Sequence, residues 1–85
     1  MRETKDLEFK GSISNTFLKT VCAFANFNGG KILFGIADDG TVKGIDNPQE
    51  CCLEIENKIK DSFKPIPEYS LSIDAKTNVI TLCVK

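Results

Sequence analysis

The chain has 85 residues, of which 41% are hydrophobic and 27% are charged, and its formal net charge is −1. This length suits one domain, the composition is that of a folded protein, and no apolar run approaches the roughly 20 residues that cross a bilayer. The balanced charge excludes a globally basic surface, so binding to nucleic acid would need a local patch. Residues 1–6 are too polar for a secretion signal, and we expect a cytoplasmic protein.

The first predicted element is a strand at residues 7–10, where apolar and charged side chains alternate. Leu7 and Phe9 are expected to face the core. Glu8 and Lys10 would then share the other side of the strand, because successive side chains of a strand point to opposite faces.

A helix is predicted next. Gly11-Ser12 ends the strand, and Ser12 or Ser14 can cap the helix at its start. The apolar positions that follow recur at helical spacing: Phe17, Leu18, Val21, Cys22, Phe24 and Ala25. Asn28-Gly29-Gly30 ends the helix, since glycine adopts the left-handed conformation without a side-chain clash.

The middle of the chain predicts a central strand and a hairpin. Residues 31–37 are almost uninterrupted apolar sequence, which is typical of a strand covered on both faces. Asp38-Asp39-Gly40 predicts a turn, and residues 41–45 are expected to return as the hairpin partner.

A second helix and a second hairpin complete the chain. Asn47-Pro48 is a strong helix start, with Glu50 placed to close a capping box, and Cys52, Ile55, Ile59 and Phe63 form the apolar stripe. Pro65 and Pro67 end this helix. The alternating segments 69–73 and 80–84 predict the last hairpin, which gives the order β-α-β-β-α-β-β and an α+β, two-layer fold with two helices on one mixed sheet. Because the last strand runs to Lys85, we expect residues 1–85 to be a single domain from a longer polypeptide.

Four cysteines occur, at Cys22, Cys51, Cys52 and Cys83. With no histidine and no Cys-x-x-Cys pair, a zinc site is not expected, and any bound metal would be a hard cation held by oxygen. Cys22 and Cys83 lie in apolar patterns and are expected to be small core residues.

Several segments closely resemble the Schlafen AlbA_2 domain family, also called the divergent AAA domain: Glu3-Thr4-Lys5-Asp6-Leu7-Glu8-Phe9-Lys10, Lys19-Thr20-Val21-Cys22-Ala23-Phe24-Ala25-Asn26, Gly29-Gly30, and Phe34-Gly35-Ile36-Ala37-Asp38-Asp39-Gly40. The resemblance covers about residues 3–84. It implies a nucleic-acid-binding (DNA-binding) module of a bacterial transcriptional-regulator-like protein. The P-loop of ATPases, Gly-x-x-x-x-Gly-Lys-Ser/Thr, is absent from the sequence.

The resemblance also implies a candidate catalytic and metal-binding set, because related animal domains cleave RNA with three acidic residues and a divalent metal. By motif these residues are Glu3, Glu8 and Asp38, and Mg²⁺ or Mn²⁺ would be the metal. Residues five apart in a regular strand face opposite sides, so Glu3 and Glu8 need a bend between them to converge. The alternative is two surface acids and an Asp-Asp-Gly turn.

Four lysines are candidate phosphate contacts: Lys10, Lys19, Lys31 and Lys43. Each is alternatively a solvated surface residue. Asn26 either ties its turn to the next strand or contacts a ligand. Phe9, Phe17, Phe24 and Phe34 fall in core patterns and offer no stacking platform.

Three functions are therefore open. The first is a nucleic-acid-binding module without catalysis. The second is a metal-dependent endoribonuclease using the three carboxylates. The third is an interaction domain that forms a homodimer through an exposed edge strand.

Overall fold

The computed structural model of the chain describes residues 4–85. In chain order the elements are β1 (Leu7–Lys10), α1 (Phe17–Asn26), β2 (Gly30–Phe34), α2 (Pro48–Ser62), β3 (Tyr69–Asp74) and β4 (Val79–Val84). The strands form one sheet in the order β1-β2-β4-β3. Strand β1 runs parallel to β2, whereas the β2–β4 and β3–β4 pairs are antiparallel, so the predicted mixed sheet is confirmed.

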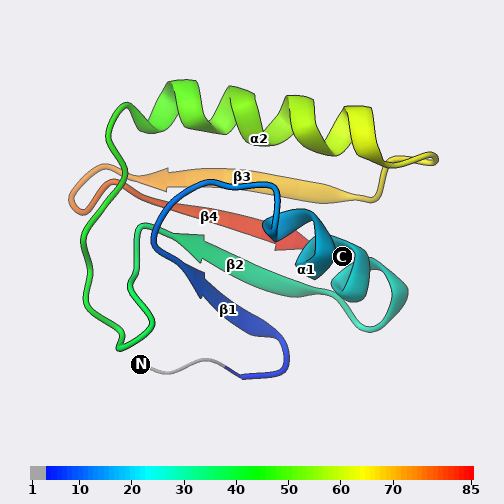
Figure 1. Cartoon of the computed structure of the whole chain (residues 1–85), viewed down its shortest axis with the longest axis horizontal. Helices are drawn as coiled ribbons and strands as arrows, with labels where there is room; N and C mark the ends of the chain where they lie inside the picture. The colour runs from blue at the N-terminus through cyan, green and yellow to red at the C-terminus, as the bar shows by residue number, and fades with distance from the viewer. Residues whose placement is uncertain (1–3) are drawn as a thin grey trace.

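Both helices pack on one face of the sheet, and Figure 1 shows α2 alongside β3 and α1 in front of the sheet. Phe17 of α1 and Phe34 of β2 meet edge to face, with ring centroids 5.5 Å apart. Such a contact adds about 0.5–1.5 kcal/mol to the free energy of unfolding beyond area burial. The buried core on this side is Phe17, Val21, Phe24, Ile32, Phe34, Ile45, Ile55, Ile59, Ile80, Leu82 and Val84.

The other face of the sheet carries a smaller apolar cluster made by Phe9, Ile36 and Val79, with Leu7 and Leu33 packed against it. Leu7 and Phe9 therefore face a core, as expected, but it is this second cluster and not the one beneath the helices. Leu7 and Phe9 point away from the helices, and the charged side chains of β1 lie on the helix-bearing face.

The turn from α1 to β2 forms as predicted. The N–H of Gly29 donates to the carbonyl of Phe24 at 2.9 Å, and Gly29 has a φ of 84°. A Cβ on Gly30 would lie 2.7 Å from Cε1 of Phe24, so Gly30 lets the aromatic ring close over the start of β2. The double glycine is a helix end and a close-packing site.

Two local predictions differ from the structure. Residues 41–45 form no strand, since their pairing with the central segment is reduced to a single bridge between Ile36 and Val42. Gly35, with a φ of 101°, turns the chain after β2 and accepts hydrogen bonds from the N–H groups of Lys43 and Gly44. Asn47 does precede Pro48 at the start of α2, but in the left-handed conformation and without a side-chain cap.

The loop between β1 and α1 is attached to α2. Lys58 Nζ donates to Asn15 Oδ1 at 2.7 Å, a hydrogen bond between residues 43 apart in the sequence. This contact places residues 11–16 over the helix-bearing face, where Figure 1 shows the loop passing in front of the sheet.

Candidate nucleic-acid interface

Glu8 lies on the helix-bearing side of β1, where it interacts with α1. The hydroxyl of Thr20 in α1 donates a hydrogen bond to Oε2 of Glu8. Lys10 Nζ lies 3.4 Å from the same oxygen, and the Lys10 and Glu8 side chains are 23% and 32% exposed. The carboxylate is thus held by one residue of the helix and one of its own strand.

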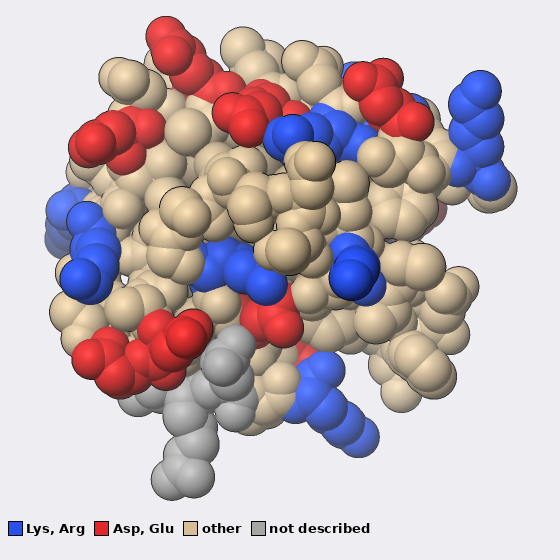
Figure 2. Space-filling model, viewed as in Figure 1, with Lys and Arg blue, Asp and Glu red and all other residues tan. Residues whose placement is uncertain are grey.

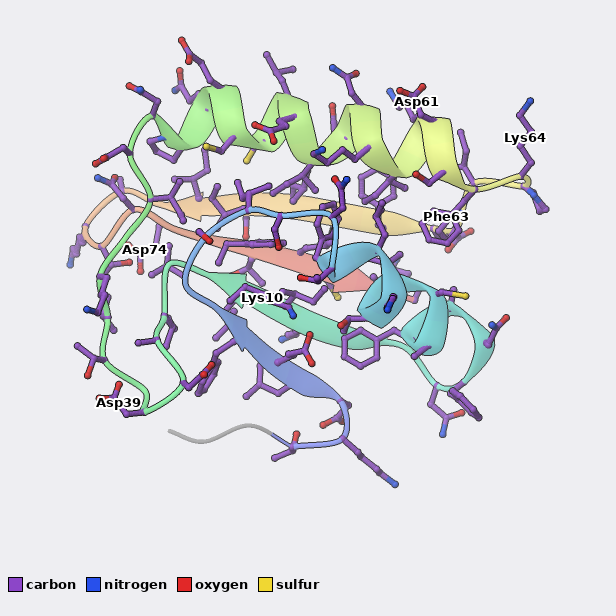
Figure 3. The ribbon with its side chains drawn as sticks, in the orientation of Figure 1. Lys10, Asp39, Asp61, Phe63, Lys64 and Asp74 are labelled. Carbon is purple, nitrogen blue, oxygen red and sulfur yellow. The ribbon has the colours of Figure 1, made fainter. Side chains whose placement is uncertain are left out.

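Lys10 is the candidate phosphate contact that the structure places beside a carboxylate. Its backbone carbonyl accepts the N–H of Gly35 at 2.7 Å, which fixes the end of β1 against β2. Figure 3 shows the Lys10 side chain in front of the sheet, on the side that carries α1. The prediction that Lys10 and Glu8 share one strand face is confirmed by their ion pair.

The other three lysines do not gather around Lys10. In the strand register Lys31 is paired with Leu7, and Lys10 with Phe34, so Lys31 lies on the face away from the helices. Lys43 lines the same pocket as Gly11 and Ser12, the two residues that follow Lys10 in the sequence. Lys19 is exposed on α1. Figure 2 shows acidic and basic side chains interspersed on this face, without a continuous basic surface.

The three candidate carboxylates are only partly within the described structure. Glu3 lies outside the described residues. Glu8 is placed as above, and Asp38 is exposed in the turn between Ile36 and Val42, the two residues that a single β-bridge joins. Within residues 4–85 no three acidic or cysteine side chains are grouped so as to hold a metal ion. The described residues therefore do not make a metal site by themselves.

Asp39, the neighbour of Asp38, has a structural role in this turn. Hydrogen bonds from the side chain of Thr41 and from its backbone N–H, the latter at 2.9 Å, lower the pKa of Asp39 below its ordinary value of 3.8. Figure 3 shows Asp39 at the tip of its loop, well apart from Lys10. The turn interpretation therefore accounts for Asp39.

Two side chains near the site were not singled out by sequence reasoning. Thr20 carries no motif of its own, and only the packing of α1 against β1 reveals its contact with Glu8. Phe27 is 81% exposed, although it follows the helix that carries the core phenylalanines. The exposure of Phe27 could have been predicted from helical spacing. The buried positions Phe17, Val21 and Phe24 would be followed by position 28, so position 27 falls outside the buried face.

Cys22 differs from expectation, and Asn26 does not make the first of the two contacts expected for it. Cys22 is exposed and is not a core residue, while Cys83 is half-buried. The amide of Asn26 donates to Cys22 Sγ at 3.5 Å, a contact one turn back within α1 that does not reach the next strand.

These features define an α+β domain in which two helices cover one face of a mixed sheet, with a threonine–glutamate–lysine cluster where β1 meets α1. A sequence model of the family described as Schlafen, AlbA_2 matches residues 3–85, and the chain belongs to this family. Membership associates the domain broadly with nucleic acid. No helix in residues 4–85 has the length and apolar character needed to span a membrane.

Proposed function

We propose that this domain binds nucleic acid, with DNA as the leading ligand, and that it serves as a module of a cytoplasmic, transcriptional-regulator-like protein. The bound strand lies along the edge formed by β1 and α1. The observation that carries the proposal is the position of Lys10, a partly exposed lysine at the end of β1, in a chain of a nucleic-acid-associated family.

Lys10 is the main positive charge at this edge, and Lys43 is proposed as a second, separate phosphate contact. Lys43 lines a pocket with Gly11 and Ser12, the residues that follow Lys10, and Asp46 and Glu54 line the same pocket. Lysines of this kind contact backbone phosphates and position a strand without reading its sequence.

The affinity is expected to be low. Glu8 neutralises part of the Lys10 charge, and the whole chain has a net charge of −1. Binding that depends on a few lysines falls steeply as salt rises, because each phosphate contact releases counterions. The domain alone would bind detectably only at low ionic strength.

A mobility-shift titration tests the proposal, with single- and double-stranded DNA and RNA at low salt. Lys10→Gln should weaken binding and reduce the salt slope by about one, the value for one lost phosphate contact. Lys64→Gln is the matched control, because Lys64 is an exposed lysine beyond the end of α2, far from Lys10 in Figure 3. The absence of any retained nucleic acid at low salt would overturn the proposal.

Metal-dependent RNA cleavage is the second candidate function. The observation that favours it is Glu8, whose carboxylate is fixed by Thr20 beside a lysine. Glu3, Glu8 and Asp38 would be the metal ligands and Mg²⁺ or Mn²⁺ the metal, as the hard oxygen ligands require. Incubation of structured RNA with the wild-type chain and Mn²⁺, beside Asp38→Ala, tests this candidate. Equal loss of RNA in both samples excludes the three-carboxylate site.

The domain is also proposed to form a homodimer through β3. This strand pairs with β4 and lies at one edge of the sheet, and its exposed residues are Ser70, Ser72 and Asp74. An open strand edge can pair with the same edge of a second copy. Light scattering over a range of concentrations tests this, and a constant monomer mass contradicts it.

A further inference from the structure

Phe27 is the most exposed large apolar side chain among residues 4–85, at 81% of its surface. It lies directly after α1, where its N–H donates to the carbonyl of Phe24 at 3.3 Å. A phenylalanine ring held at a helix end and left in water has a face available for stacking. The other large apolar side chains that are exposed among these residues, Val42, Leu53 and Ile66, are aliphatic.

Phe27 borders a pocket of about 400 Å³ that contains both apolar and polar groups. Phe27 supplies the exposed aromatic surface, and the wall includes Phe24, which is only 7% exposed. Gly29 also lines the pocket and has no side chain to fill it. Lys5, Asp6 and Asn28 supply a cation, an anion and an amide at the same pocket.

Asp6 is held in an ionised state suitable for accepting hydrogen bonds. The hydroxyl of Thr4 donates to Asp6 Oδ1 at 2.6 Å, and this hydrogen bond lowers the pKa of Asp6 below its ordinary value of 3.8. A carboxylate at a pocket with aromatic walls repels a phosphate but accepts N–H groups from the edge of a base. Lys5 provides the compensating positive charge for the backbone.

The pocket is lined by residues close in sequence to those of the Glu8 site. Thr20, which binds Glu8, is four residues before Phe24 on α1, a rise of about 6 Å along the helix. Asp6 directly precedes β1 and is two residues before Glu8, about 7 Å along an extended chain. Along both α1 and the chain that enters β1, the pocket therefore lies toward the start of β1, whereas Lys10 is at its end.

We propose that this pocket binds one unpaired nucleobase, which stacks on Phe27 and directs an N–H group to Asp6, while Lys5 contacts the adjoining backbone. The inference rests on the proposed nucleic-acid binding and specifies its ligand as single-stranded. A base within a duplex has both faces covered by its neighbours, so it cannot stack on Phe27.

The test compares Phe27→Ala and Phe27→Trp with the control Leu53→Ala, which removes a 61% exposed side chain from α2. The probes are a single-stranded mixed-sequence oligonucleotide and the same sequence fully paired, both at low salt. Phe27→Ala removes the stacking of one base, so its affinity for the single strand should be about 5- to 150-fold lower than that of the wild type. The affinity of Phe27→Ala for the duplex should equal that of the wild type. Leu53→Ala should bind both probes as the wild type does, and Phe27→Trp should retain its affinity for the single strand.

Phe27→Trp also gives a direct signal, because the chain contains no tryptophan. Stacking should quench the fluorescence of the new indole when the single strand is added, and the duplex should not. Quenching by the oligonucleotide supports the pocket even if mobility shifts are too weak to quantify.

The outcomes separate this inference from the function on which it rests. If the wild-type chain binds neither probe, the proposed nucleic-acid function fails. If the wild type binds and Phe27→Ala binds equally well, the function stands and the base pocket is overturned. A change in oligomeric mass with Phe27→Ala, without a change in single-strand affinity, would assign Phe27 to a contact between copies and also overturn the pocket.

Discussion

The hydroxyl of Thr20 donates to the carboxylate of Glu8, joining the middle of α1 to the middle of β1 across 12 residues of sequence. Lys10 approaches the same carboxylate oxygen, at 3.4 Å. The position of the Glu8 side chain thus depends on the packing of α1 against β1. Substitutions that remove single polar groups of Thr20 or Glu8 test this dependence.

Replacing Thr20 by valine should lower the free energy of unfolding by about 1 kcal/mol, because valine keeps the shape of threonine and removes the hydrogen bond to a charged group. Thr20→Ser keeps the hydroxyl and should lose less. Urea denaturation of both variants provides the measurement. Equal stability of Thr20→Val and the wild type would show that the hydrogen bond contributes nothing to folding.

Glu8→Gln should strengthen nucleic-acid binding by about two- to five-fold at low salt, since it frees Lys10 from its ion pair and leaves an oxygen for Thr20. The gain should disappear at high salt. Glu68→Gln, which makes the same charge change in the exposed residue before β3, is the control in the same titration. If Glu8→Gln instead weakens binding, Glu8 itself contacts the ligand.

Gly29→Ala should destabilise the fold by more than about 1–2 kcal/mol, the cost of a left-handed backbone for a residue with a side chain. The added Cβ would also lie 2.5 Å from the carbonyl oxygen of Val84, which cannot move without disturbing β4. Gly11→Ala is the matched control, since its Cβ meets no atom within 4 Å. It should stay within about 1 kcal/mol of the wild type. Thermal or urea unfolding compares the two, and a similar loss in both would contradict the close approach at Gly29.

Asp39 should make folding dependent on pH in the acid range. Because the pKa of Asp39 is lower in the folded chain than its ordinary value of 3.8, its stabilising effect is present above that value and is lost as the pH falls through the folded pKa. Asp39→Asn keeps an oxygen for Thr41 but cannot titrate. The stability difference between wild type and Asp39→Asn, measured by urea midpoints, should therefore stay constant at pH values well above 3.8 and narrow as the pH falls below that value. A constant difference would show that the charge of Asp39 is irrelevant.

Much of the fold could be predicted from local sequence. The Asn28-Gly29-Gly30 turn, Pro48 at the start of α2 and the hairpin of β3 and β4 are all encoded by residues close together in the chain. The orientation of β1 could not be predicted in this way. Its alternating pattern shows that two faces differ, but the second apolar cluster around Phe9 means that both faces of the sheet are apolar.

The candidate site shows the same division. The pairing of Lys10 with Glu8 follows from strand periodicity, and it is confirmed. The contact from Thr20 depends on how α1 docks, which no local pattern fixes. The expected strand at residues 41–45 fails for a similar reason, because the left-handed turn at Gly35 takes the chain out of the sheet after β2.

The hydrogen bond from Lys58 to Asn15 has a mechanical consequence for the whole edge. It joins the segment that follows Lys10 to α2, so we expect a displacement of α2 to alter the position of the end of β1. A partner bound to α2 would then change the affinity of Lys10 for the proposed nucleic acid without contacting the nucleic acid itself.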